Sequence, residues 1–376
     1  MKETIDTNNP EIRPVLNFSD TLIVSISFHL LAITSFEELS ESLYSTAWLS
    51  VKWTDQNLKW LPSDYGGLVK TTVPPHKIWN PSIAVLNSID ELKPIDSQFL
   101  HPTVCSNGTV RWTPGSAFRT SCKMNVESFP FDVQSCELEF FVWGHEIESV
   151  DLEPYIDHVD LDTFKENGEW ELIGSSLERK FLNTEGKPHP TIVVTLRLKR
   201  RATVLIQSII IPLVILANIN VLVFLVPAET GEKISFSVTI LLAFGVFLGF
   251  INDRMPQTSE TTSSLSVYMS CLLAFSAVFV FMSILIAKIH NKTQKISGSW
   301  LFLYMRVLRP CCGRRKDNIT VTSEGKDEEG PKNSPNVTWR SIARSIDSLL
   351  FWVFFPPVFL TSFALLIIPS ILNCSR

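Results

Sequence analysis

The 376-residue sequence is poor in charge and in cysteine, and it lacks the common motifs of enzymes. Charged residues make up 19% of it, and its formal net charge is only -5. No basic patch is present that would follow a phosphate backbone, which argues against a nucleic-acid partner. Seven cysteines are too few for a disulfide framework. There is no glycine-rich phosphate loop, nucleophile elbow or metal-spaced His/Cys cluster, so we expect neither enzyme activity nor a cofactor or metal site.

Apolar residues are abundant, at 45%, and they form long runs in the second half of the chain. The runs cover residues 204–226, 234–251, 267–289 and 349–372. Each is about as long as the ~20 residues that a helix needs to cross a bilayer. We therefore expect four parts: a domain outside the membrane at 1–201, three transmembrane helices within 202–290, a cytoplasmic segment with amphipathic helices at 291–345, and a fourth transmembrane helix with a short C-terminus at 346–376.

Lysine and arginine indicate on which side of the membrane each loop lies. The segment at 291–345 is rich in both, whereas the loop between the second and third runs has only Arg254, against Asp253 and Glu260. Because positive loops stay in the cytoplasm, we expect a multi-pass protein of the plasma membrane with both termini extracellular. The first residues lack the basic start and apolar core of a secretory signal, so we expect that a leader has been trimmed from this sequence.

The first half of the chain shows the two-residue period of half-buried strands. Apolar and polar residues alternate along 22–30, 136–142 and 192–198. Turn signals such as Ser106-Asn107-Gly108 and Asn167-Gly168 separate the strands. Many short strands joined by regular turns predict an all-β, immunoglobulin-like sandwich of about ten strands.

The second apolar run carries a stripe of residues spaced three or four apart, which places them on one face of a helix. The stripe consists of Glu232, Ser235, Thr239, Leu242, Val246, Phe250 and Asp253. Its length is roughly 32 Å at ~1.5 Å per residue, close to the hydrocarbon thickness of a bilayer. In a ring of such helices, Glu232 and Asp253 would form carboxylate rings that select cations, and Leu242 and Val246 would form an apolar gate. The alternative is that Ser235 and Thr239 only join packed helices and that the acids are ordinary helix ends.

Several motifs together resemble one family of membrane proteins. Cys122 and Cys136 enclose thirteen residues that include Phe129-Pro130-Phe131-Asp132. Elsewhere the chain has Trp53-x-Asp55-x-x-Leu58-x-Trp60, Asp64-Tyr65-Gly66-Gly67 and Gly231-Glu232-Lys233-Ile234-Ser235. From about residue 15 to 290, and again over the last span, the chain resembles the Cys-loop, or pentameric ligand-gated, ion channels, in particular the nicotinic acetylcholine and serotonin type-3 branch.

The resemblance implies a pentamer around a central pore, an extracellular sandwich and a four-helix transmembrane bundle in each subunit. It also implies a disulfide between Cys122 and Cys136 that closes a loop resting on the membrane domain. Anion channels of the family carry Pro-Ala-Arg at the inner end of the pore helix, where this chain has Gly231-Glu232-Lys233. The resemblance therefore favours permeant cations.

By the same resemblance, a small ligand binds between subunits in a box of aromatic side chains, whose faces attract amines. Trp143 matches the central tryptophan of the box and Trp48 the one from the complementary subunit, although a packed core tryptophan is the alternative for each. The remaining candidates are Phe181, Leu86, at a tyrosine position of the family, and His145. The capping loop has no adjacent cysteine pair, so acetylcholine is not the expected agonist. A homopentamer with an unidentified agonist, a complementary subunit of a heteropentamer, and a non-conducting receptor in the bilayer remain open.

The resemblance also implies a contact that couples ligand binding to pore opening. Arg200 matches the basic residue before the first span, and Glu38 matches the acid that pairs with it. Leu39, Phe131 and Pro256 are expected at the same junction. For Arg200 the alternative is a helix-end anchor at the membrane surface.

Two further features concern the surface of the first domain. Residues 146–171 are strongly acidic, with a spacing that fits no defined calcium loop, so we favour a solvated face over a divalent-ion site. Asn17, Asn107 and Asn373 begin glycosylation sequons on segments expected to be extracellular.

Overall fold

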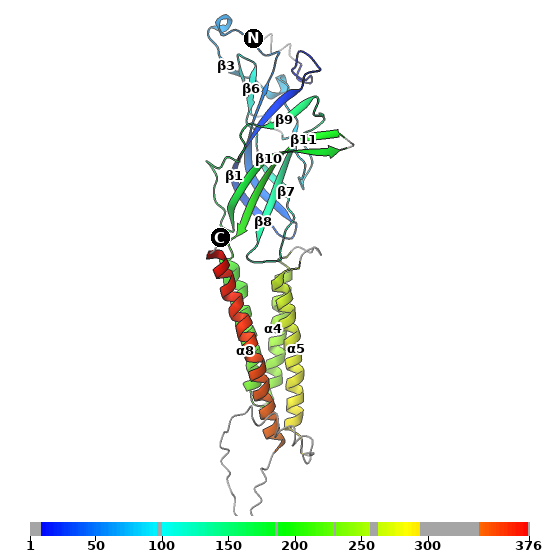
Figure 1. Ribbon diagram of the computed structural model, residues 1–376, viewed down its shortest axis with the longest axis vertical. Helices are drawn as coiled ribbons and strands as arrows, with labels where there is room; N and C mark the ends of the chain where they lie inside the picture. The colour runs from blue at the N-terminus through cyan, green and yellow to red at the C-terminus, as the bar shows by residue number, and fades with distance from the viewer. Residues whose placement is uncertain are drawn as a thin grey trace, which may run out of the picture. The chain divides into compact units, whose positions relative to one another are not determined.

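The structure is a computed structural model that describes residues 9–95, 100–184, 187–228, 231–255, 262–293 and 338–374. The chain divides close to Ala202 into two compact units, one of strands and one of helices (Figure 1). Most of the segment at 291–345 lies outside the described residues, as does Pro256.

The β-rich unit contains two sheets. The larger has the order β3-β5-β6-β2-β1-β9, with β7 also paired to β2. Its strands are β1 (Leu22–Glu37), β2 (Ser42–Thr54), β3 (Lys70–Thr72), β5 (Thr103–Cys105), β6 (Thr109–Trp112), β7 (Gly115–Ser121) and β9 (Val150–Pro154). β1 runs antiparallel to β2 and parallel to β9. Two short 3-10 turns, η1 (Pro62–Tyr65) and η2 (Pro75–Lys77), interrupt the loops.

The smaller sheet has the order β10-β11-β8-β4. Its strands are β4 (Ile83–Val85), β8 (Val133–Val142), β10 (Trp170–Thr184) and β11 (Lys187–Arg200). In Figure 1 the outer ends of β10 and β11 project sideways from the rest of the sandwich.

The core of the sandwich follows the predicted alternation. Val24, Ile26 and Phe28 are fully buried, whereas Ile23, which lies between the buried Leu22 and Val24, is exposed. Phe28 of β1 contacts Phe140 of β8 with ring centroids 5.6 Å apart, so the two sheets meet through their apolar faces. The expected sandwich of about ten strands is confirmed.

The helical unit contains four helices long and apolar enough to cross a membrane, among the residues described. The first runs over Thr203–Leu225 and is composed of α2 (Thr203–Leu205), a π-helical segment η3 (Ile206–Ile210), α3 (Ile211–Val221) and a 3-10 segment η4 (Leu222–Leu225). The others are α4 (Glu232–Asn252), α5 (Ser264–His290) and α8 (Trp339–Cys374). The wide turn of η3 comes just before Pro212, whose missing N–H interrupts the regular hydrogen-bond ladder of a helix.

Aromatic side chains hold the helices of this unit together. Phe279 of α5 lies 4.9 Å from Phe354 of α8 and 5.0 Å from Phe224 of η4, measured between ring centroids. The fourth helix begins at Trp339, ahead of the expected start at residue 346. Arg340 and Arg344 lower the hydropathy of the first turns of α8, so these turns do not belong to an apolar run.

Candidate functional site

A disulfide closes the loop between β7 and β8. It joins Cys122 to Cys136 across a sequence separation of 14, as the resemblance implied. Within this loop Asn125 and Gln134 bond to each other in both directions: the Asn125 N–H donates to Gln134 Oε1 at 2.9 Å, and Gln134 Nε2 donates to the Asn125 carbonyl at 2.9 Å. Gln134 Nε2 also donates to Asp132 Oδ2 at 2.6 Å. These bonds fix the Asp132 carboxylate at the start of β8.

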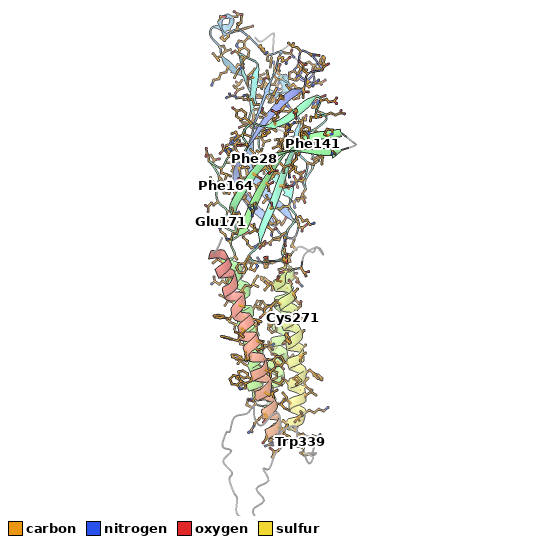
Figure 2. All side chains as sticks on the ribbon, in the orientation of Figure 1. Phe28, Phe141, Phe164, Glu171, Cys271 and Trp339 are labelled. Atoms are coloured by element: carbon orange, nitrogen blue, oxygen red, sulfur yellow. A yellow bond between two sulfur atoms is a disulfide. The ribbon has the colours of Figure 1, made fainter. Side chains whose placement is uncertain are left out.

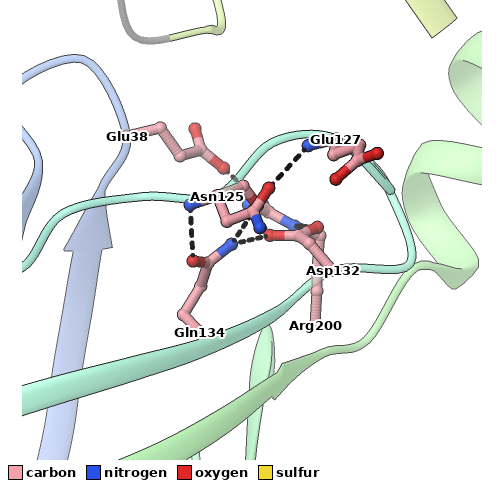
Figure 3. A network of polar contacts seen from close by, with 6 residues as sticks. All are labelled: Glu38, Asn125, Glu127, Asp132, Gln134 and Arg200. Atoms are coloured by element: carbon pink, nitrogen blue, oxygen red, sulfur yellow. Dashed lines mark hydrogen bonds and ion pairs between the residues drawn. The ribbon is translucent and has the colours of Figure 1, made fainter. Parts of the chain in front are cut away.

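Asp132 is the main partner of Arg200, at the end of β11 (Figure 3). Arg200 Nε donates to Asp132 Oδ1 at 2.8 Å and Nη2 donates to Oδ2 at 3.2 Å, a two-pronged geometry that suits a guanidinium. The side chains of Arg200 and Asp132 are only 6% and 1% exposed. Arg200 also forms an ion pair with Glu38, through Nη1 and Oε1.

Aromatic rings enclose the same guanidinium. Its central carbon lies 4.3 Å from the ring centroid of Trp170 and 5.1 Å from that of Phe129. Burial by itself lowers the pKa of Arg200, but the hydrogen bonds and charges of Asp132 and Glu38 together outweigh burial, so the pKa is raised. The group is a permanent, buried cation shared by three segments of the sandwich.

The resemblance implied the pairing of Arg200 with Glu38, which the structure contains, but the sequence analysis missed Asp132. Asp132 could have been suspected as a partner of Arg200, because it is an acidic residue directly after Phe129-Pro130-Phe131 in the disulfide-closed loop. Of the other residues expected nearby, Leu39 is exposed and Phe131 is partly buried. Pro256 falls outside the described residues.

Four of the five candidate ligand residues lie on or beside the smaller sheet. Trp143, just after β8, has an exposed side chain, and its backbone N–H donates to the Ser82 carbonyl at 2.8 Å. Its indole lies 6.1 Å from the ring of Phe141, which Figure 2 places beside the β10–β11 hairpin. Leu86 follows β4 and is partly buried.

Phe181 and His145 have partners within the chain. Phe181 is exposed, but the guanidinium carbon of Arg179 lies 4.8 Å from its ring centroid, and Arg179 is in turn paired with Asp151. The ring of His145 lies 6.1 Å from that of Trp79. Burial, and then the charge of Arg13, lower the pKa of His145. At neutral pH His145 is therefore an uncharged ring.

Trp48 lies on the larger sheet, in β2, and is partly buried. The imidazole of His29, opposite it on β1, stacks on the indole with centroids 5.3 Å apart and planes 19° apart. The chain therefore does not bring Trp48 together with Trp143 in one sheet. The stacking of His29 on Trp48 could not be predicted from the sequence, because it depends on the register of β1 and β2.

The stripe predicted on the second span lies on one exposed face of α4. All seven residues are exposed in the single chain, with Leu242 and Val246 at 68% and 65%. The buried residues of α4 are Lys233, Ser237, Ile240, Phe244 and Ile251. At ~100° per residue these two sets lie on roughly opposite sides of the helix.

The start of α4 is set by Gly231, whose φ of 68° lies in the left-handed region that favours glycine. Glu232 is consequently the first residue of the helix, where the helix dipole stabilises a negative charge. Lys233 points the other way: its ammonium pairs with Asp347 of α8, and both side chains are buried. Two adjacent charges are thus separated onto opposite faces.

Among the described residues, no group of three or more His, Cys, Asp or Glu side chains is arranged to hold a metal ion. Members of the acidic tract bind basic partners instead: Asp151 pairs with Arg179 and Glu166 with Arg201. Asn17 and Asn107 are exposed. Asn373 is in the last turn of α8, where side chains are outside the described part.

Two family models match the chain. The neurotransmitter-gated ion-channel ligand binding domain matches residues 1–202, and the neurotransmitter-gated ion-channel transmembrane region matches residues 209–302. The first match ends where the strands end, and the second covers α4 and α5.

Three similar curated proteins are acetylcholine receptor subunits. The chain is 31% identical to the acetylcholine receptor subunit alpha-type acr-16 of Caenorhabditis elegans over 316 residues, which are 81% of this chain and 63% of that protein. It is 31% identical to the human neuronal acetylcholine receptor subunit beta-3 over 75% of this chain and 62% of that protein. With the human neuronal subunit alpha-2 it shares 29% identity over 75% of this chain and 53% of that protein. The chain thus spans between 53% and 63% of the length of these relatives. It is a multi-pass membrane protein and belongs to the neurotransmitter-gated ion-channel, or Cys-loop receptor, family.

Proposed function

We propose that this chain is a subunit of a ligand-gated cation channel, in which five subunits surround a pore lined by α4. A small extracellular ligand, bound between sandwiches, opens the pore. The strand unit and both chain termini are extracellular, and the segment at 291–345 is cytoplasmic. The relatives named acetylcholine receptor subunits, together with the Gly231-Glu232-Lys233 sequence, support a channel for cations.

One observation carries the proposal: the polar and apolar stripe of α4 is exposed along its whole length while the opposite face is buried. Acids at both ends of an apolar helix are costly to expose to lipid, because charged side chains near hydrocarbon lose their hydration. A ring of identical helices places these acids in water. Lys233, which would repel cations from the same level, is held away from the stripe by Asp347.

The proposed ligand contacts are Trp143, Phe181, Leu86 and His145 on one subunit and Trp48 on its neighbour. This division follows the two sheets, because Trp48 is on β2 and the others are on or beside the smaller sheet. Leu86 offers no aromatic face, and the faces of Phe181 and Trp48 already contact Arg179 and His29. These contacts weaken cation–π attraction for an amine, so acetylcholine is not the proposed high-affinity agonist.

The proposed coupling element is the contact of Arg200 with Asp132 and Glu38, and we assign Leu39, Phe131 and Pro256 to the same coupling role by resemblance. It joins the disulfide-closed loop, the β1–β2 turn and the last strand before the first span. Any ligand-driven shift between these three segments must change the geometry of one buried cation.

The pore can be tested without knowing the agonist. Leu242→Ser removes an apolar ring that closes the pore by dewetting, and we expect it to produce a ligand-independent cation current in voltage-clamped cells. Adding Glu232→Gln should then lower single-channel conductance several-fold, because the inner carboxylate ring no longer concentrates cations.

Phe281→Ser on α5 is the matched control, because Phe281 is 60% exposed and lies on another helix. It should produce no such current. If surface expression is verified and Leu242→Ser passes no current, α4 does not line a cation pore. A chain that reaches the surface only with a related subunit would instead support the alternative of a complementary subunit in a heteropentamer.

A further inference from the structure

His29 is held at both ring nitrogens. Nδ1 lies 2.8 Å from Asp160 Oδ2, and Nε2 lies 3.0 Å from Ser50 Oγ. The ring is largely buried and stacks on Trp48. An imidazole fixed in this way has one orientation in which all its polar atoms are satisfied.

The backbone fixes Asp160 beside His29. The Leu30 N–H donates to the Asp160 carbonyl at 3.1 Å, and the Asp160 N–H donates to the Phe28 carbonyl at 3.0 Å. Asp160 is therefore bonded to the residues on either side of His29. Its carboxylate also accepts the Asp162 N–H at 2.9 Å, which, with the charge and hydrogen bond of His29, lowers the pKa of Asp160. The carboxylate stays charged when the imidazole gains a proton.

Both charge states of His29 are accommodated. In the neutral ring, Nδ1–H donates to Asp160 and Nε2 accepts from the Ser50 hydroxyl. In the charged ring, Nδ1–H and Nε2–H both donate, and Ser50 Oγ turns to accept. Because a hydroxyl donates or accepts by rotation, a proton binds without breaking either contact. Histidine is also the side chain whose charge changes near physiological pH.

Other charged groups lie on the elements packed against His29. The loop that carries Asp160 also has Asp157, His158, Asp162, Lys165 and Glu166, β9 has Asp151 and Glu153, and β2 has Lys52. Asp151 is paired with Arg179 and Glu166 with Arg201. His158 pairs with Asp157, and its charge also acts on Asp160. Among these titratable groups, His29 is the one whose ring stacks on the indole of Trp48.

We propose that His29, Asp160 and Ser50 form a proton-binding site behind Trp48, and that His29 thereby sets the charge preference of the ligand site. The inference rests on the proposed function, which assigns Trp48 to that site. Protonation raises the net charge of the His29–Asp160 pair from -1 to 0 and places an imidazolium against one face of the indole, so a cation on the remaining surface is held less strongly. Proton binding and the binding of a cationic ligand are then antagonistic, whereas a neutral ligand of the same shape is unaffected.

The first experiment tests the proton site without any ligand. In the purified full-length receptor, tryptophan emission is measured between pH 7.5 and 5.5. A stacked imidazolium quenches indole emission, so the wild type should lose up to about a tenth of its signal, the share of one of ten tryptophans. This step should vanish in both His29→Gln and Trp48→Phe and persist in His158→Gln. A step that survives His29→Gln, or no step in the wild type, overturns the inference whatever the channel does.

The second experiment measures the affinity of choline and of its neutral isostere 3,3-dimethylbutan-1-ol at the same two pH values. For charges about 7 Å apart, choline should bind roughly three- to eightfold more weakly at pH 5.5, and the alcohol should not change. His29→Gln should abolish the difference. Equal pH dependence for both ligands, or for wild type and variant, overturns the antagonism. If the fluorescence step is present but neither protein binds choline, the antagonism is wrong, because Trp48 accepts no cation. The Leu242→Ser current is a separate test of whether α4 lines a cation pore.

Discussion

Asp132 and Glu38 both pair with Arg200, but they differ in burial, and this difference predicts separate consequences for folding and for gating. The Asp132 side chain is 1% exposed and the Glu38 side chain is 26% exposed. We expect Asp132→Asn to destabilise the sandwich strongly and Glu38→Gln to leave it nearly intact. Glu38 can then be changed to test coupling without losing the protein.

The magnitudes follow from the surroundings of each carboxylate. Breaking a buried ion pair by removing one partner costs about 3–5 kcal/mol, because the other charge stays buried without full compensation. Arg200 is 6% exposed, so this range applies to Asp132→Asn. A partly exposed pair is screened by water and contributes about 0–1 kcal/mol. For a domain of this size, each kcal/mol lowers the midpoint of thermal unfolding by about 2–4 °C. The expected shifts are therefore about 10 °C and about 2 °C.

The assay is thermal unfolding of the detergent-solubilised full-length chain, together with its amount at the cell surface. Arg200→Lys is an informative third variant, because lysine keeps the charge but cannot donate in two-pronged geometry to Asp132. It should fall between the two carboxylate variants. Equal shifts for Asp132→Asn and Glu38→Gln would refute the reasoning, since burial would then not determine the strength of these pairs.

Three further predictions concern other parts of the chain. Asp347→Leu leaves the ammonium of Lys233 buried without its partner and should strongly reduce the amount of protein at the cell surface. The double variant with Lys233→Met should recover much of this amount. No recovery would argue against a direct pairing of the two side chains. Replacing Cys122 and Cys136 with Ser opens a loop of sequence separation 14 and should cost about 3 kcal/mol, seen as a lower unfolding midpoint that the wild type matches only under reducing conditions. Burial and a nearby positive charge lower the pKa of His145 in the folded chain. Its contribution to stability is therefore full above the unfolded pKa of about 6.5 and is lost as the pH falls below that value. His145→Gln should flatten this part of the stability–pH profile, and an unchanged profile would contradict a lowered pKa for His145.

Local pattern was sufficient to place most elements. Alternation along 22–30 and 192–198 marked the strands whose apolar residues are buried. Uninterrupted apolar runs marked three of the four helices to within three residues of their ends. The fourth helix was placed too late, because its first turns are amphipathic and only contact with α5 and the first span makes them helical.

The sequence by itself determined which residues share a face, because strand and helix periods are local properties of the chain. The stripe of α4 and the pairing of Cys122 with Cys136, the latter by resemblance, needed no tertiary structure. Only the fold decided which distant side chains meet. Arg200 reaches Asp132 across 68 residues and Lys233 reaches Asp347 across 114, and His29 meets Trp48 through the register of β1 and β2. Such partners depend on how sheets and helices pack. Only the tertiary structure therefore decided which basic side chain contacts each candidate aromatic ring, His29 on Trp48 and Arg179 on Phe181.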